Sequence, residues 1–317
     1  MKNGTWSRAE HRLALATCSS LPDLDVDDQL LLAPLAARGV AATAVVWDDP
    51  DVSWSAFDGV LVRSCWDYHL RARDFNRWID ALEAASVQLW NPPAVLRWNA
   101  EKSYLRDLAA RGVDVVPTRW VERGAAESLA SVLAETGWSR AVVKPAISAA
   151  AHCTWRTSPG EAAAREVEFR ALVASGRVLV QPYIDVVEHD GEWSLVFLGG
   201  AFSHAVVKRP KAGDFRVQSH HGGEARAMVA PPALIAAAEA VVRAGAATCL
   251  YARVDGCVLD GRFHLMELEL LEPSLFLGEH PAAAERLADA VVRALDERNT
   301  AGVGTRRPEP RDGASTR

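Results

Sequence analysis

Short apolar runs alternate with longer amphipathic segments along the first ninety residues. The runs that we expect to form strands are Arg12–Cys18, Val40–Trp47, Gly59–Arg63 and Val87–Trp90. Asp27–Arg38 and Leu70–Ala85 lie between them and have the apolar spacing of helices. This alternation predicts an α/β arrangement with a parallel sheet and crossover helices. Asn91-Pro92-Pro93 then interrupts the pattern and marks the first domain boundary.

The alternation continues up to Pro182 and then changes. The helices expected in this stretch are Ala100–Arg111, Ala125–Glu135 and Glu161–Ala174, and the strands are Val115–Val121, Arg140–Lys144 and Arg177–Pro182. Beyond it, Glu192–Leu198, Ala201–Lys208 and Phe215–Gln218 follow one another as strands without a helix between them, which predicts antiparallel pairing. Gly199-Gly200 is a two-residue hairpin turn.

The last part of the chain contains one more hairpin and two helices. Tyr251–Leu259 and Arg262–Leu271 pair across Asp260-Gly261, while Pro232–Ala246 and Ala282–Leu295 are helical. Residues 299–317 are rich in Gly, Pro, Thr and Arg, so we expect a disordered tail there. The folded units are expected to be 1–92, 93–182 and 183–298.

Composition narrows the class of protein. The 317 residues carry a net charge of −6 and no basic stripe, which argues against a nucleic-acid partner. The five cysteines are odd in number and form no CxxC, which argues against a disulfide framework and a structural zinc site. No apolar run is long enough to span a membrane. We therefore expect a cytoplasmic protein that acts on a small molecule.

Two acidic residues on one strand are the first candidates for chemistry. Glu267 and Glu269 are two residues apart in an apolar strand, so their carboxylates share one face. A divalent cation would offset their repulsion, and Mg²⁺ or Mn²⁺ suits oxygen ligands. Asp255 lies on the partner strand, where a two-residue Asp260-Gly261 turn would place it on the opposite face from Glu267. The metal interpretation therefore requires a three-residue loop; the alternative is a solvated edge strand.

Basic residues form the second group of candidates. Lys144 ends a buried strand, where an ammonium is unfavourable without an anion. Lys102 opens a helix, and Lys208 and Arg216 precede Gly222-Gly223. Cations that converge on a carboxylate–metal site suggest a polyphosphate ligand. The sequence has neither a GxxxxGK[ST] loop nor a GxGxxG after the first strand, so P-loop and dinucleotide Rossmann sites are not supported.

A series of segments carries a family resemblance. In chain order they are Asn91–Pro93 with Asn99–Lys102, Val142–Pro145, Val180–Ile184, Gly191–Trp193, Lys208–Gly223, and Arg253–Asp255 with Glu267–Pro273. Together they resemble the ATP-grasp ligases, in particular the bacterial glutathione synthetase-like branch. The run from Met266 to Pro273 is also similar to the small ATP-grasp enzymes of antibiotic pathways, among them the cyclo-ligase type that closes the cycloserine ring.

The resemblance implies a fold and a set of roles. It implies a Rossmann-like N-terminal substrate domain (1–92), a central ATP-grasp subdomain (93–182) and a C-terminal antiparallel, metal-binding subdomain (183–298). The residues implied to hold ATP are Lys102, Lys144, Ser148, Gln181, Pro182, Tyr183, Ile184, Glu192 and Lys208. Mg²⁺ is implied on Asp255, Glu267 and Glu269, and the catalytic residues are implied to be Arg216, Arg253 and Lys208. The loop from Ala146 to His152 departs from the family because it has no glycine.

The implied reaction forms an acyl phosphate from an amino-acid-type carboxylate and passes it to an amine. Arg63 ends the third expected strand, and Trp66 and Asp67 follow it, at the edge where parallel sheets bind ligands. Arg63 is therefore a candidate for a substrate carboxylate and Asp67 for an amino group. A loop salt bridge is the alternative. His221, Gly222 and Gly223 are further substrate candidates.

Three functions stay open: an intermolecular ligase, an intramolecular cyclo-ligase, and a non-catalytic nucleotide-binding protein. A homo-oligomer is an expectation by analogy with related enzymes.

Overall fold

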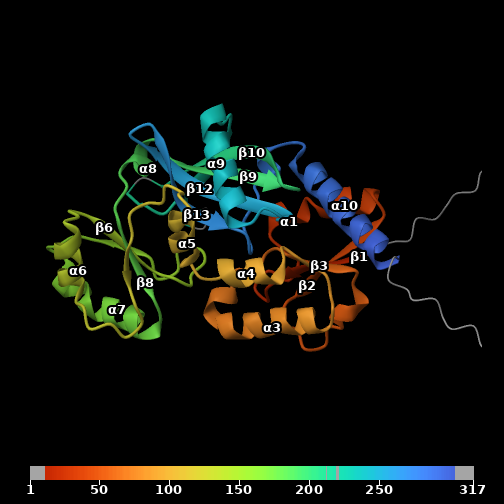
Figure 1. The fold of residues 1–317 in the computed structure, drawn as a ribbon, viewed down its shortest axis with the longest axis horizontal. Helices are drawn as coiled ribbons and strands as arrows, with labels where there is room; N and C mark the ends of the chain where they lie inside the picture. Colours follow the sequence, from red (N-terminus) through yellow and green to blue (C-terminus); the bar gives the residue numbers. More distant parts are fainter. Residues whose placement is uncertain (1–10, 212, 219–220, 304–317) are drawn as a thin grey trace, which may run out of the picture.

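The structure is a computed structural model that describes residues 11–211, 213–218 and 221–303. Three sheets follow one another along the chain. Figure 1 shows the central sheet with α6 and α7 at one end of the long axis and the N-terminal sheet at the other, while the C-terminal sheet spans the space between them. The predicted parallel N-terminal sheet and antiparallel C-terminal sheet are confirmed, whereas the antiparallel pairing of the central sheet was not predicted from the alternation of its elements.

The N-terminal sheet has the strand order β2-β1-β3-β4, and every pair in it is parallel. Its strands are β1 (His11–Thr17), β2 (Val40–Val46), β3 (Gly59–Val62) and β4 (Leu89–Trp90). Its helical segments are α1 (Val26–Gln29), α2 (Leu32–Ala37), η1 (Trp54–Ala56), η2 (Tyr68–Arg71) and α3 (Ala72–Ala84). α3 buries Phe75, Trp78, Ile79 and Leu82 at helical spacing, so its apolar stripe holds it to the protein core.

The central sheet has the order β5-β8-β6-β7 and is antiparallel throughout. Its strands are β5 (Arg119–Val121), β6 (Ala141–Pro145), β7 (Trp155–Thr157) and β8 (Val178–Pro182), and its helices are α6 (Leu129–Thr136) and α7 (Ala162–Ser175). Both helices pack into a core cluster made only of residues between 121 and 180. This sheet therefore has an apolar core of its own.

The C-terminal sheet has the order β11-β10-β9-β12-β13. Its strands are β9 (Glu192–Leu198), β10 (Ala201–Arg209), β11 (Glu224–Met228), β12 (Tyr251–Leu259) and β13 (Arg262–Glu269). Gly199-Gly200 forms the predicted two-residue turn, since Leu198 pairs with Ala201. The strand that we expected at Phe215–Gln218 is wrong, because the Asp214 side chain accepts hydrogen bonds from the Phe215 and Arg216 amides and holds a turn there.

A β-bulge sets the faces of the β12–β13 hairpin. Leu259 pairs with Arg262 across a two-residue turn, so the three-residue loop that we required is wrong. The register then shifts next to Gly256, and from there Asp255 pairs with Glu267. The extra residue reverses the alternation of faces on one strand only. Both acids therefore lie on the same face in spite of the short turn.

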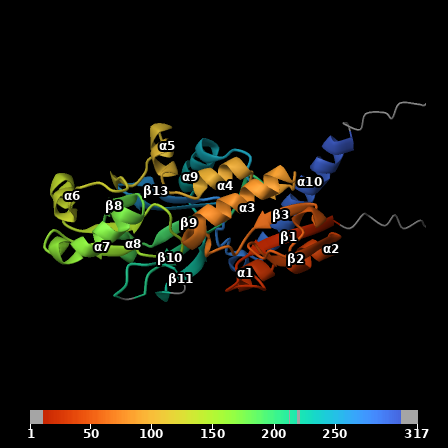
Figure 2. The ribbon, with the colours of Figure 1, turned by 90° about the horizontal axis from the view of Figure 1, so that it is seen from below.

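Helices and buried side chains join the sheets. The remaining helical segments are α4 (Pro93–Asn99), α5 (Tyr104–Ala110), α8 (Val186–His189), α9 (Pro232–Gly245), η4 (Leu277–Glu279) and α10 (Ala283–Val303). One core cluster combines Leu13 of β1, Val196 of β9 and Leu287 of α10, so the N-terminal and C-terminal sheets share a core. Seen from below in Figure 2, α3 and α4 lie beside each other along this join.

α10 is longer than predicted. It runs to Val303, so the disordered tail that we expected from Asn299 does not begin there, and residues 304–317 lie outside the described part of the chain. Within the described residues, no helix is long and apolar enough to cross a membrane.

Candidate active site

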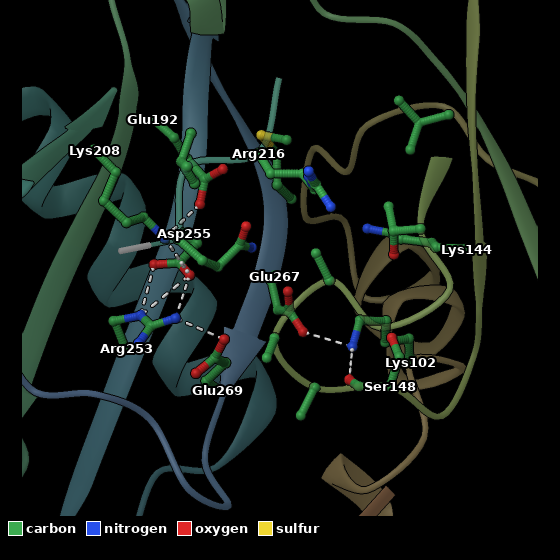
Figure 3. A pocket seen from close by; sticks show the side chains of 18 of the residues that line it. Lys102, Lys144, Ser148, Glu192, Lys208, Arg216, Arg253, Asp255, Glu267 and Glu269 are labelled. Atoms are coloured by element: carbon green, nitrogen blue, oxygen red, sulfur yellow. Dashed lines mark hydrogen bonds and ion pairs between the residues drawn. The ribbon is translucent and has the colours of Figure 1, made fainter. Parts of the chain in front are cut away.

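A cavity of about 290 Å³ lies between the central and C-terminal sheets. Its walls also include Trp66 and Tyr68 from the N-terminal part of the chain. Most of the predicted ATP, metal and catalytic residues line it, as the close view in Figure 3 illustrates for ten of them. The cavity is therefore the candidate active site.

A buried network of ion pairs occupies one wall. Asp255 is 1% exposed and accepts hydrogen bonds from Ser194 at 2.6 Å and from Arg253 at 2.8 Å, and its carboxylate lies 3.1 Å from the Lys208 ammonium. Lys208 also pairs with Glu192 at 2.7 Å. Burial opposes ionisation of Asp255, but Arg253 and Lys208 more than offset it, and the pKa of this carboxyl lies well below its usual range.

Glu269 lies at the end of this network. Arg253 pairs with Glu269 across β12 and β13 and donates a hydrogen bond of 2.6 Å to its carboxylate. Burial raises the pKa of Glu269 to about 8, with Arg253 opposing the shift and the neighbouring Glu267 adding to it. The ionised form of this carboxyl is therefore favoured by any further cation that comes within reach.

Two lysines face Glu267 from the other side of the cavity (Figure 3). Lys102 lies 2.8 Å from the Glu267 carboxylate and donates a hydrogen bond of 2.7 Å to the Ser148 carbonyl. Lys144 reaches into the cavity from β6, and Figure 3 marks no ion pair between it and the other residues drawn there. Burial lowers the pKa of Lys144, although the charge of Glu267 opposes this. A bound anion such as a phosphate would stabilise the charged ammonium of Lys144, which burial destabilises.

The glycine-free loop after Lys144 adopts glycine-like geometry. Ala150 and Ala151 have φ values of 53° and 55°, in the left-handed region that favours glycine. Both residues line the cavity together with Ser148 and Ala149. The loop thus reaches the conformation of a glycine-rich loop with alanines, at a cost of about 1 kcal/mol for each such residue.

The segment from Gln181 to Ile184, which the resemblance implies to hold ATP, forms one end of the cavity. Gln181, Pro182, Tyr183 and Ile184 all line it, and the centroid of the Tyr183 ring lies 6.2 Å from that of Phe215. The Tyr183 amide already donates to the Arg140 carbonyl. An apolar slot beside strand backbone is what a flat heteroaromatic base requires.

Arg216 lines the cavity as predicted, but its guanidinium is engaged. It pairs with Asp214 at 2.8 Å, which holds the pKa of that carboxyl well below its usual range. To contact a phosphate, the Arg216 guanidinium would have to leave Asp214 or bind both groups at once. Arg253, in contrast, is fixed within the acidic network.

The structure does not bring two of the predicted substrate residues to the cavity. Arg63 is fully buried, pairs with Asp28 at 2.7 Å and donates to the Pro273 carbonyl. Asp67 accepts a hydrogen bond of 2.9 Å from Trp47 and pairs with Arg71. Both side chains are therefore used in structural ion pairs, which was the alternative interpretation.

The other substrate candidates divide into two groups. Trp66 and Gly223 line the cavity, whereas His221 and Gly222 do not belong to its lining. A Cβ at Gly223 would lie 2.2 Å from the Val217 carbonyl oxygen, so the turn at this position has no room for a side chain. Packing alone therefore explains why residue 223 is a glycine, without any contact to a substrate.

Several cavity residues were not predicted from the sequence, and two of them have side chains suited to binding. Glu272 and Tyr68 line the cavity and are 8% and 5% exposed. Glu272 had a usable signal, because it is an acid between two leucines and a proline at the end of an apolar strand. Tyr68 had none, since a tyrosine near a helix start is ordinary.

The acids fit a metal ion only together with another ligand. Among the described residues, no three His, Cys, Asp or Glu side chains are arranged to hold a metal by themselves. Asp255 is already engaged by Ser194, Arg253 and Lys208. Mg²⁺ is commonly held by one or two carboxylates together with substrate phosphates, and Glu267 and Glu269 match that pattern.

Three comparisons relate this chain to known proteins. A family model described as the N-terminal domain of D-cycloserine synthetase DcsG matches residues 13–91. The cycloserine biosynthesis protein DcsG of Streptomyces lavendulae is 34% identical over 303 residues, which cover 89% of this chain and 98% of that protein. The crystal structure of D-cycloserine synthetase DcsG superposes with a TM-score of 0.82 at 30% identity, covering 90% of this chain and 99% of the other.

A more distant structure shares the fold. D-alanine–D-alanine ligase from Bacillus anthracis, in complex with ATP, has a TM-score of 0.66 at 16% identity, over 92% of this chain and 99% of the ligase. The fold and the cavity with its cations and acids therefore define an ATP-grasp enzyme, an ATP-dependent carboxylate–amine ligase. Within that class, the chain belongs to the DcsG family, and the resemblance seen in the sequence is confirmed.

Proposed function

We propose that this enzyme closes a ring within one amino-acid substrate, forming D-cycloserine. The observation that supports this is the match to DcsG over nearly the whole length of both chains. D-cycloserine contains an amide-type bond between its carbonyl carbon and an aminooxy nitrogen. Adding one water across that bond gives D-2-amino-3-(aminooxy)propanoate, which is therefore the open substrate that a carboxylate–amine ligase would close.

The chemistry proceeds in two displacements. A carboxylate oxygen of the substrate attacks the γ-phosphorus of ATP, and ADP leaves. The aminooxy nitrogen then attacks the acyl carbon, the C–O bond to phosphate breaks, and the nitrogen loses a proton as the ring closes. Positioning and charge stabilisation are the main catalytic effects in such reactions.

The cavity residues are proposed to divide these tasks. Lys144 and Lys102 neutralise the phosphates, and the left-handed loop at Ala150 presents backbone to them. Mg²⁺ on Glu267 and Glu269 would stabilise charge on the transferring phosphoryl group. Arg253 is proposed to stabilise the acyl phosphate, with Asp255 holding its guanidinium in place. Arg216 and Lys208 are further cations that line the same cavity.

Mass analysis of the product tests the proposal. The protein is incubated with Mg-ATP and the D-substrate, and we expect ADP, phosphate and a product lighter than the substrate by one water. Glu267→Gln should reduce the rate at least ~100-fold, because the charge opposite Lys102 is lost. Glu285→Gln, an exposed change on α10, serves as the matched control. A product heavier than the substrate would instead identify an intermolecular ligase.

A further inference from the structure

The segment that follows β13 is held by side chains rather than by secondary structure. The carbonyls of residues 270 to 275 each accept a hydrogen bond from a side chain elsewhere in the chain. In order, the donors are Asn91, Tyr251, Trp66, Arg63, Arg253 and His204. The donors come from the N-terminal part and from the C-terminal sheet, so both parts of the molecule fix this one segment.

Glu272 is the ionisable side chain that this segment presents to the cavity. The Trp66 indole donates to the Glu272 carbonyl at 3.1 Å, and Arg63 donates to the next carbonyl at 2.7 Å. Arg63 is itself oriented by the buried Asp28. The backbone of Glu272 is therefore held in one position although it lies outside helices and strands.

The Glu272 carboxylate lacks a cation of its own within the described residues. Lys102 and Arg253 are the two cations that act on it, and both are engaged with other groups. Lys102 is bonded to Glu267 and the Ser148 carbonyl. The Arg253 donors contact Asp255, Glu269 and the Ser274 carbonyl. Burial raises the pKa of Glu272 to about 7, with Lys102 opposing the shift, so a cation that enters the cavity would stabilise the ionised carboxylate.

Aromatic rings complete this corner of the cavity. Trp66 and Tyr68 both line it, and the hydrogen bond from the Trp66 indole to the Glu272 carbonyl places this ring beside the segment. A carboxylate beside aromatic rings is a suitable environment for a substituted ammonium. A phosphate or a carboxylate would be repelled there.

We propose that Glu272 binds the α-ammonium group of the amino-acid substrate, with Trp66 and Arg63 as positioning residues behind it. This inference rests on the proposed function, since it assumes an amino acid whose carboxylate is activated. The ammonium at Glu272 would direct the substrate carboxylate toward Arg253 and the phosphate-binding lysines. Glu272 would thereby select amino acids over simple carboxylic acids.

Two probes that differ only in the ammonium test the inference. D-2-amino-3-(aminooxy)propanoate and 3-(aminooxy)propanoate keep both reacting groups, but the second lacks the α-amino group. Each is titrated calorimetrically into the full chain with Mg²⁺ and a non-hydrolysable ATP analogue. We expect the wild type to bind the first probe roughly 10- to 100-fold more tightly, as for a hydrogen bond between charged groups. In Glu272→Gln we expect the two affinities to agree within about threefold.

Several outcomes would overturn the inference. They are equal binding of both probes by the wild type, no binding of either, or preserved discrimination in Glu272→Gln. The wild-type comparison does not depend on how the variant folds, and the variant is accepted only if it keeps its affinity for the ATP analogue. Glu285→Gln should discriminate like the wild type, because this residue is exposed on α10.

Turnover of the same probes separates the two proposals. Discrimination at Glu272 without ring closure would support the ammonium subsite and overturn the cyclisation. Ring closure of both probes at the same kcat/KM would support the cyclisation and overturn the ammonium subsite.

Discussion

Two lysines of the cavity have opposite electrostatic surroundings. Burial disfavours the charge of Lys102, but its pairing with Glu267 more than offsets this, so its pKa lies above the usual value. Lys144 is also buried, and there burial dominates, so its pKa lies below the usual value. Lys102 therefore stabilises the folded protein. The buried charge of Lys144 destabilises it until an anion is bound.

Methionine substitutions should therefore have opposite effects in the absence of nucleotide. Lys102→Met leaves Glu267 unpaired and should lower the free energy of unfolding by about 3 kcal/mol. Lys144→Met should raise it by about 1 kcal/mol, because an unfavourable buried charge is removed. Urea unfolding with and without Mg-ATP provides the measurement, and Lys144→Met should lose most of the stabilisation by nucleotide. Equal destabilisation by both changes would contradict this assignment.

His204 predicts a loss of stability in acid. Burial lowers the pKa of its imidazole to about 4, while the hydrogen bond from Nε2 to the Leu275 carbonyl opposes the shift. The unfolded chain takes up this proton near pH 6.5, where the folded protein does not. The contribution of neutral His204 to the free energy of unfolding is therefore fully present above about pH 6.5. It falls as the pH drops toward 4, and the loss reaches about 2.5 kcal/mol at pH 4.5.

Urea unfolding at pH 7 and pH 4.5 tests this expectation. His204→Gln keeps a donor for Leu275 but does not titrate, so its free energy of unfolding should fall by about 2.5 kcal/mol less than that of the wild type over this range. The exposed His189→Gln should follow the wild type. Parallel pH profiles for all three proteins would refute the role of His204.

At the scale of single elements, the phosphate loop shows how conformation can replace composition. Ala150 and Ala151 occupy left-handed backbone positions that glycine fills without strain, whereas Ala149 in the same loop is not among the residues with positive φ. The absence of glycine in the sequence predicted a divergent loop. The structure instead keeps the left-handed geometry and stores strain in the alanines.

Glycine substitutions at two positions of this loop should therefore change the free energy of unfolding in opposite directions. Ala150→Gly should raise the free energy of unfolding by about 1 kcal/mol, since it relieves a left-handed alanine. Ala149→Gly should lower it by about 0.5 to 1 kcal/mol, because it only adds freedom to the unfolded chain. Denaturant titration of both variants measures this contrast. Destabilisation by Ala150→Gly would show that the alanine is not strained.

The sequence predicted elements better than it predicted their junctions. The period-two placement of Glu267 and Glu269 and most of the strands and helices follow from local pattern, and the structure agrees. The short edge strands β7 and β11 were not predicted. The bulge beside Gly256 could not be predicted, because one added residue in a ladder leaves no periodic signal. Arg63 was misassigned because only the tertiary structure brings Asp28 and the Pro273 carbonyl to it.

At the scale of the whole molecule, the three sheets are unequally coupled. The N-terminal and C-terminal sheets share a buried core cluster that includes Leu15 of β1, Leu198 of β9 and Val291 of α10. Most buried side chains of the central sheet belong to a separate cluster, whereas Leu179 of β8 and Ala146 after β6 join the cluster of the C-terminal sheet. Lys102 and Arg177 provide polar links between the central sheet and its surroundings. Extensive shared apolar burial couples elements more strongly than a partly exposed ion pair such as Arg177–Glu101 does.

This difference in coupling predicts two unfolding units. The N-terminal and C-terminal sheets should unfold together, because side chains of β1, β9 and α10 are buried against one another in a single core. The central sheet should open separately at a lower free energy, since most of its buried apolar side chains pack among residues 121 to 180 and few of them join the core of the C-terminal sheet.

Amide hydrogen exchange followed by mass spectrometry measures this difference. Without nucleotide, peptides from β6 and β8 should exchange through an opening of lower free energy than peptides from β1 and β9, because their core is separate. In the proposed binding mode, a non-hydrolysable ATP analogue with Mg²⁺ would contact both sides of the cavity, so it should raise the opening free energy of β6 and β8 by about 2.7 kcal/mol at a hundredfold excess over Kd. The same analogue should protect these strands less in Lys144→Met, because this variant lacks the cation that β6 places in the cavity.

Equal exchange of all three sheets before nucleotide is added would show that the molecule opens as one unit. The separate core would then have no dynamic consequence.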